Sequence, residues 1–76
     1  MSDLPSVSGK DVVKAFVKLG FTHVRTKGSH FILKRDGHPL LVAVPVHANK
    51  PVKKGTLHGA IGASGFSEDQ FLDALK

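Results

Sequence analysis

Three segments of the chain carry apolar residues at the spacing of a helix. The clearest is 9–19, where Val12 and Phe16 share one face and lysines occupy the other. A second, 56–64, has a weaker apolar stripe, because its glycines each cost about 1 kcal/mol relative to alanine. A short third segment follows Ser67. We therefore predict two helices and a final helical turn.

Capping patterns mark the ends of these helices. Residues 8–11 and 67–70 each begin with serine and carry an acidic or amide side chain three positions later, the pattern of a capping box. Gly20 is suited to the left-handed residue that ends a helix, which would let Phe21 pack back on Phe16.

The chain between the first two helices has the residue preferences of strands. Residues 22–27 mix β-branched and polar residues and predict a half-exposed strand, and residues 30–35 predict a second. Residues 39–46 are apolar on both faces, which predicts a central or covered strand, with Pro45 at its weak end or at an edge. Residues 47–55 predict a basic loop.

Two dipeptides that contain glycine separate these strands. Gly28-Ser29 lets the chain turn sharply before the second strand. Asp36-Gly37 is a strong signal for a two-residue hairpin, which would set His30 beside residue 43 and His47 just beyond the end of the second strand. The two imidazoles are then expected near the same edge of the sheet.

The order of these elements is α-β-β-β-α, with an additional helical turn at the end. This order predicts a single α+β domain over residues 1–76, with a three-stranded antiparallel sheet and helices packed on one face. The other face of the sheet is left open to solvent or to a partner.

Charge is concentrated in the middle of the chain. The formal net charge of the 76 residues is +5, but residues 10–54 hold ten Lys or Arg residues against Asp11 and Asp36, a formal charge of +8. A polyanion such as nucleic acid is the natural partner of such a block. The alternative interpretation is a solvated surface that keeps the protein in solution.

The sequence lacks cysteine and any secretion or membrane segment, and this excludes several classes of protein and of site. There is no cysteine, which excludes disulfides, thiolate metal sites and a cysteine nucleophile. The N-terminal residues lack the basic and apolar regions of a secretion signal, and the longest apolar stretch is too short to span a bilayer. We expect a cytoplasmic protein without a membrane segment.

Among the five histidines, His30 is the best candidate for chemistry. It follows the flexible Gly28, and Arg25 and Lys27 precede it, while Lys34 shares its face of the second strand. A phosphate held by those cations would lie near the imidazole.

Two imidazoles and several cations suit metal-independent cleavage of RNA. One group takes a proton from the ribose 2′-OH, another gives a proton to the departing 5′ oxygen, and cations stabilise the charge on phosphorus. Two-metal, zinc and serine-nucleophile chemistries fit less well, because clustered carboxylates, tight histidine spacing and a nucleophile elbow are missing.

Several other residues have simpler interpretations. Ser29 is expected to be a turn residue, His38 to lie beside the hairpin turn, and His58 to lie on the solvent side of a helix. The basic loop is either solvated or in contact with phosphate, through Lys50, Lys53 and Lys54. The phenylalanines are expected in the core and not on a stacking platform for bases: Phe16, Phe21, Phe31, Phe66 and Phe71.

An ordered set of short motifs resembles the HicA toxin family of toxin–antitoxin systems, over about residues 4–75. The motifs are Gly20-Phe21, Arg25, Lys27 to His30, Val44 to His47, Lys54 to Leu57, Ile61, Gly65 to Ser67 and Phe71-Leu72. Residues 57–62 depart from the family pattern, because they lack its larger and basic side chains.

The resemblance implies a fold like the double-stranded RNA-binding domain and endoribonuclease activity on mRNA that inhibits translation. It implies a HicB-like antitoxin as partner and no metal or organic cofactor. The catalytic histidine of the family corresponds to His30, and the family often has a histidine at the position of His47. We predict RNA contacts from the residues around it: Arg25, Lys27, Gly28, Ser29, Lys34, His47, Lys53 and Lys54.

Two other functions remain open at this point. A non-catalytic RNA-binding module of the same fold would bind RNA in a salt-dependent way without cleaving it. A degenerate toxin would be retained only as a protein-interaction domain.

Overall fold

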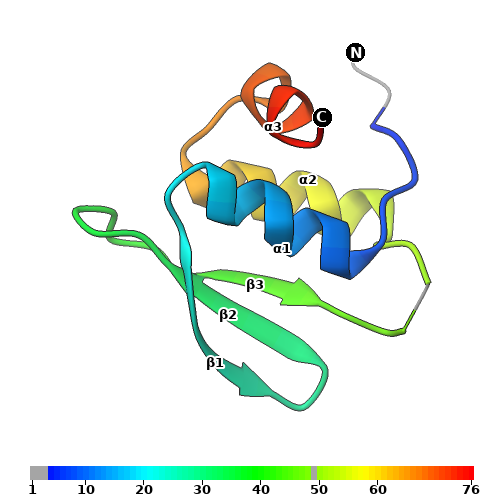
Figure 1. Cartoon of the computed structure of the whole chain (residues 1–76), viewed down its shortest axis with the longest axis horizontal. Helices are drawn as coiled ribbons and strands as arrows, with labels where there is room; N and C mark the ends of the chain where they lie inside the picture. The colour runs from blue at the N-terminus through cyan, green and yellow to red at the C-terminus, as the bar shows by residue number, and fades with distance from the viewer. Residues whose placement is uncertain (1–3, 49) are drawn as a thin grey trace.

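Three helices and three strands alternate along the chain in the predicted order. The computed structural model describes residues 4–48 and 50–76. The elements are α1 (Gly9–Lys18), β1 (Thr22–Lys27), β2 (His30–Lys34), β3 (Val42–Pro45), α2 (Lys54–Ser64) and α3 (Glu68–Ala74) (Figure 1). The α+β class and the α-β-β-β-α order are confirmed, and both agree with a fold like the double-stranded RNA-binding domain. In the part of the chain that is described, every helix is too short or too polar to cross a membrane.

The strands form one antiparallel sheet in the order β1-β2-β3, so β2 is central. Helices α1 and α2 cover one face of this sheet, and α3 lies beyond them (Figure 1). The rings of Phe16 in α1 and Phe71 in α3 are 5.2 Å apart. None of the helices formed by the described residues lies over the opposite face of the sheet, as the sequence predicts.

The core forms where the sheet meets α1 and α2. Leu33 of β2 is fully buried there, as are side chains from every covering element. Alternate residues of a strand face opposite sides. Burial of Leu33 therefore directs His30, Ile32 and Lys34 to the open face. The largest fully buried apolar side chains are Phe16, Phe71, Leu33, Leu57, Val12, Val42 and Val44.

The ends of α1 follow the predicted capping pattern. Ser8 Oγ accepts a hydrogen bond of 3.2 Å from the backbone N–H of Asp11. Gly20 has φ +103°, and the N–H of Phe21 donates to the carbonyl of Phe16 over 3.0 Å. The rings of these two phenylalanines meet edge to face at 5.6 Å. This is the hydrogen-bond pattern of a Schellman motif, which fixes where β1 begins.

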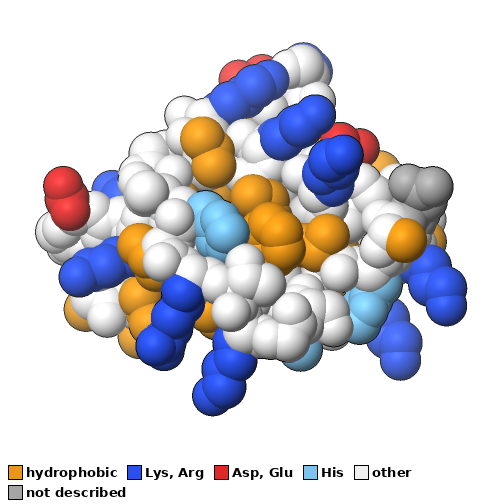
Figure 2. Space-filling model, turned by 60° about the horizontal axis from the view of Figure 1, so that its bottom comes forward, with side chains coloured by type: hydrophobic (Ala, Val, Ile, Leu, Met, Phe, Trp, Pro, Cys, Tyr) orange, Lys and Arg blue, Asp and Glu red, His pale blue; other side chains and the backbone are white. Residues whose placement is uncertain are grey.

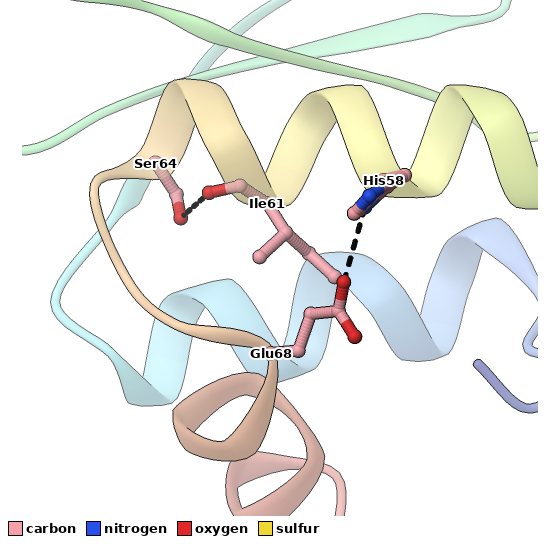
Figure 3. Close-up of polar contacts among 4 residues, drawn as sticks. All are labelled: His58, Ile61, Ser64 and Glu68. Carbon is pink, nitrogen blue, oxygen red and sulfur yellow. Dashed lines mark hydrogen bonds and ion pairs between the residues drawn. The ribbon is translucent and has the colours of Figure 1, made fainter. Parts of the chain in front are cut away.

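An ion pair joins the middle of α2 to the first residue of α3, and a hydrogen bond lies within the last turn of α2 (Figure 3). His58 Nδ1 lies 3.1 Å from Glu68 Oε2. The Ser64 hydroxyl donates to the carbonyl of Ile61 over 2.6 Å and is fully buried. Ser67 forms the predicted capping box at the start of α3.

The prediction for the third strand was wrong in its extent and in its register. β3 is an edge strand that α1 and α2 cover, which agrees with the expectation of a covered strand with Pro45 at an edge, but its pairing with β2 sets His30 opposite Pro45, not opposite residue 43. The ladder begins only at Val42, and the preceding Leu40 and Leu41 are about half exposed.

The cause of this difference lies just after the predicted turn. The Asp36-Gly37 turn does form, because the N–H of His38 donates to the carbonyl of Arg35 over 3.1 Å. Pro39 then has no N–H for the ladder. The His38 ring also turns inward and lies 2.7 Å from the carbonyl of Ala63. Pairing resumes later in the chain, two residues out of the expected register.

We predict that Gly9→Ala destabilises the protein by about 1–3 kcal/mol, because it overpacks a close contact. Gly9 is buried, and an added Cβ would overlap the backbone carbonyl of Pro45 at the end of β3. The free energy of unfolding in denaturant measures this change.

Gly59→Ala is the matched control. Gly59 lies in α2 with open space around an added Cβ, so the higher helix propensity of alanine should stabilise the protein by about 0.5–1 kcal/mol. Equal stability changes in the two variants would contradict the close packing of α1 on β3.

Candidate active site at one end of the sheet

A tight turn sets His30 at the end of the sheet. Lys27 pairs with His30 across the β1–β2 hairpin, which leaves Gly28 and Ser29 as a two-residue loop. Gly28 has φ +61°, the value that a type II′ turn requires at its first central position. The carbonyl of Ser29 accepts a hydrogen bond of 2.7 Å from the N–H of Val46. The turn is thereby tied to the chain that leaves β3.

The two-residue turn also decides which face of the sheet the cations of β1 occupy. The pairing of β1 with β2 shifts between His23 and Arg25, so Val24 is an extra residue. Directly paired residues share a face of the sheet. Lys27, opposite His30, and Arg25, opposite Ile32, are therefore on the open face. The bulge changes the residues before it: His23 pairs with Leu33 and so lies on the helix side of the sheet.

The predicted phosphate ligands differ in how near they are to His30. Lys27 is its cross-strand neighbour, and Arg25 is one pair further along. Lys34 shares the face but lies four residues along β2, about 13 Å away at the usual rise of a strand. The three cations form a strip along the open face, and only Lys27 adjoins the imidazole.

His30 and His47 line one open-sided pocket of about 310 Å³ beyond the end of the sheet. The observed register contributes directly, because His47 follows Pro45, the partner of His30, by two residues. Both histidines are exposed. The pocket is also lined by Pro45, Lys50, Pro51, Val52, Lys53 and Thr56.

The start of α2 adds positive potential to this pocket. Lys53 is its N-cap residue and makes no side-chain capping bond. The first helical hydrogen bond runs from the N–H of Leu57 to the carbonyl of Lys53, at 2.9 Å. The N–H groups of residues 54–56 therefore have no acceptor within the helix, and they lie at the positive end of its dipole. Lys54 itself is exposed but does not line the pocket.

Sequence reasoning missed part of this arrangement. The helix was expected to begin at Thr56, but it begins at Lys54, and Thr56 in its first turn lines the pocket. The loop before it folds back at Ala48, whose φ is +48°, and the N–H of Lys50 donates to the carbonyl of His47 over 2.9 Å. No propensity pattern signals a left-handed alanine.

The remaining histidines do not join this pocket. His58 is exposed on α2 and contacts Glu68, and half-buried His38 packs edge to face on Phe21. His23 is exposed on β1 and stacks on Phe31. Among residues 4–48 and 50–76, no group of three His, Asp or Glu side chains converges closely enough to hold a metal ion. The site therefore consists of two imidazoles, several cations and a helix N-terminus.

Comparison with known proteins identifies the family. A family model described as the HicA toxin of bacterial toxin–antitoxin systems matches residues 9–65, which include all three strands and the whole of α2. No curated protein sequence matches the chain. The matched region covers most of the 76 residues and contains the pocket that His30 and His47 share. The chain belongs to the HicA toxin family, the toxins of bacterial toxin–antitoxin systems.

Proposed function

We propose that this toxin is a metal-independent endoribonuclease that cleaves mRNA and thereby inhibits translation. One observation carries the proposal: exposed His30 shares a pocket with His47, Lys50 and Lys53, next to an open cationic face of the sheet. A buried imidazole, or one remote from every cation, would have excluded the mechanism.

The reaction is an internal transfer at phosphorus. The ribose 2′ oxygen loses its proton and forms a bond to phosphorus, while the bond from phosphorus to the 5′ oxygen breaks and that oxygen gains a proton. The products are a 2′,3′-cyclic phosphate and a 5′-hydroxyl. Histidine suits either proton transfer because its unperturbed pKa is near neutrality. His30 carries one transfer, and His47, which lines the same pocket, is our candidate for the other.

The surrounding charges hold the RNA backbone. Lys27, beside His30, and Lys53, in the pocket, contact the phosphates nearest the cleaved bond, with the N–H groups at the start of α2. Arg25 and Lys34 hold phosphates further along the open face. Their geometry supports one strand of RNA lying along β2 with its reactive phosphate at the end of the sheet.

The antitoxin acts on the same surface. As a member of a toxin family of toxin–antitoxin systems, the chain has an antitoxin partner. We propose that this partner is HicB-like, covers His30 and presents acidic side chains to the cations of the open face. Inhibition then requires no rearrangement of the toxin, since the site is already formed.

The alternative function is RNA binding without cleavage. The open cationic face supports binding by itself, whichever role His30 has. A binding module would tolerate loss of the imidazole with a small change in affinity, whereas a nuclease would lose turnover.

We predict that His30→Ala reduces RNA cleavage by about 10²–10⁴-fold, the contribution of general acid–base catalysis. The measurement is single-turnover cleavage of RNA in the presence of EDTA, with far-UV circular dichroism to confirm an unchanged fold. The same substitution should relieve growth arrest when the toxin is expressed.

His58→Ala is the control variant, which tests whether removal of a histidine outside the pocket also reduces cleavage. His58 is exposed on α2 and does not line the pocket, so its removal should leave cleavage nearly unchanged. Undiminished cleavage by His30→Ala, or RNA binding without any cleavage by the wild-type protein, would rule out the catalytic mechanism.

We predict that Lys53→Gln weakens RNA binding and reduces the slope of log affinity against log salt by about 0.7, the value for one phosphate contact on a single strand. The measurement is a salt titration of RNA affinity. Lys76→Gln, the same charge change at the chain terminus beside Asp73, should leave the slope unchanged. If the slope changes equally in both variants, Lys53 makes no specific contact with a phosphate.

We predict that the double variant Lys27→Glu, Lys34→Glu loses antitoxin affinity at least 10-fold, because like charges would then face each other across the interface. Affinity is measured by calorimetry with the purified antitoxin, which should also abolish RNA cleavage by the wild-type toxin. Unchanged affinity in the double variant would show that the antitoxin binds elsewhere.

A further inference from the structure

A second concavity, of about 350 Å³, lies at the same end of the sheet but on its helix side. It runs between α1 and the segment that follows β3. We call it the Phe31 groove, after the one aromatic residue in its lining: Lys10, Val13, Lys14, Phe31, Val46 and Ala48. The proposed RNA contacts around His30 do not use it.

Phe31 is not the core residue that its apolar surroundings in the sequence suggested. It is half-buried and lies outside the cluster of buried apolar residues. Its ring stacks on the exposed His23 ring, with centroids 4.5 Å apart and planes 14° from parallel. The Nε2 of His23 lies 2.8 Å from Thr26 Oγ1, which holds the imidazole in place. The result is a pair of parallel rings at the surface.

Cations border the apolar part of this groove. Lys10 and Lys14 are one turn apart on α1, and both line it. Figure 2 shows the same combination on one side of the molecule, where hydrophobic side chains gather at the centre with a histidine beside them and Lys or Arg side chains around them. Stacked aromatic rings bind an unpaired base, and neighbouring lysine side chains bind the phosphate of the same nucleotide.

The groove and the His30 pocket are lined by residues that are neighbours in the sequence. His30 and Phe31 are consecutive, and their side chains leave opposite faces of β2. Val46 lines the groove, while its neighbours Pro45 and His47 line the pocket. An RNA strand that passes over the end of the sheet can therefore present a phosphate to one side and a neighbouring base to the other.

We propose that the Phe31 groove is a nucleobase subsite, in which one unpaired base next to the cleaved bond stacks on the Phe31 ring, which His23 supports from its other side. Lys10 and Lys14 hold the phosphate of that nucleotide. This inference rests on the proposed ribonuclease function and deepens it, because it gives the toxin a contact with single-stranded RNA that reads a base and not only the backbone.

The test compares single-stranded and duplex RNA of the same sequence, bound to protein that carries His30→Ala and so leaves the RNA intact. Adding Phe31→Leu should weaken binding of the single strand by about 5- to 100-fold, the effect of losing one base stacked on an aromatic ring. Its salt slope should stay unchanged, because no phosphate contact is lost. Binding of the duplex should not change, because its bases are already paired.

Two further variants separate stacking from folding. Phe31→Tyr keeps the aromatic face and should retain the affinity for the single strand. Leu40→Ala removes an exposed apolar side chain from the distant β2–β3 connection and should have no effect. Thermal unfolding of each variant verifies that the fold is intact.

The outcomes distinguish this inference from the proposed function. If Phe31→Leu binds the single strand as tightly as its parent, the subsite is wrong, although cleavage by the wild-type protein would leave the nuclease function standing. If the parent protein binds no RNA at all, both fail. If Phe31→Leu instead loses only antitoxin affinity, the groove is a protein contact and the subsite is overturned.

Discussion

Burial of one face of a three-stranded sheet is the constraint from which the rest of this structure follows. Leu33, Val42 and Val44 are removed from water by α1 and α2, and strand alternation then dictates what the opposite face carries. Residues 4–48 and 50–76 form one sheet, and their helices all lie on one side of it, so the other side stays open. Polar and cationic residues at alternate positions of β2 become a surface that a large polyanion can reach.

The proposed functional groups lie at one end of the sheet, where burial by α1 and α2 ends. His30 begins β2 and His47 follows β3, and the hydrogen bond from Val46 to the carbonyl of Ser29 joins the two segments that carry them. Phe31 lies on the same face of β2 as the buried Leu33, but at this end of the sheet it borders a groove beside α1. The same geometry therefore provides a pocket with two imidazoles on one side and stacked rings on the other, which is why both proposals concern the same end of the sheet.

Local signals predicted much of the fold, because the physics that decides them is local. Ser8, Ser67 and Gly20 have the predicted capping roles, and Gly28-Ser29 turns the chain as expected. The register of β3 was not predictable in this way. It depends on the inward turn of His38 toward Ala63, a residue far along the chain, and this contact together with Pro39 prevents the hairpin from closing at its turn signal.

By itself, the sequence determined the order of the elements, the capped ends of α1 and α3, the cationic middle of the chain and the choice of His30, since each depends on neighbouring residues or on composition. Only the tertiary structure decided which side chains meet. The bulge at Val24 placed His23 on the side of the sheet where it stacks on Phe31, and the two-residue shift of β3 brought His47 to the pocket of His30. Bulges and strand register are set by packing between distant segments, and no local preference encodes them.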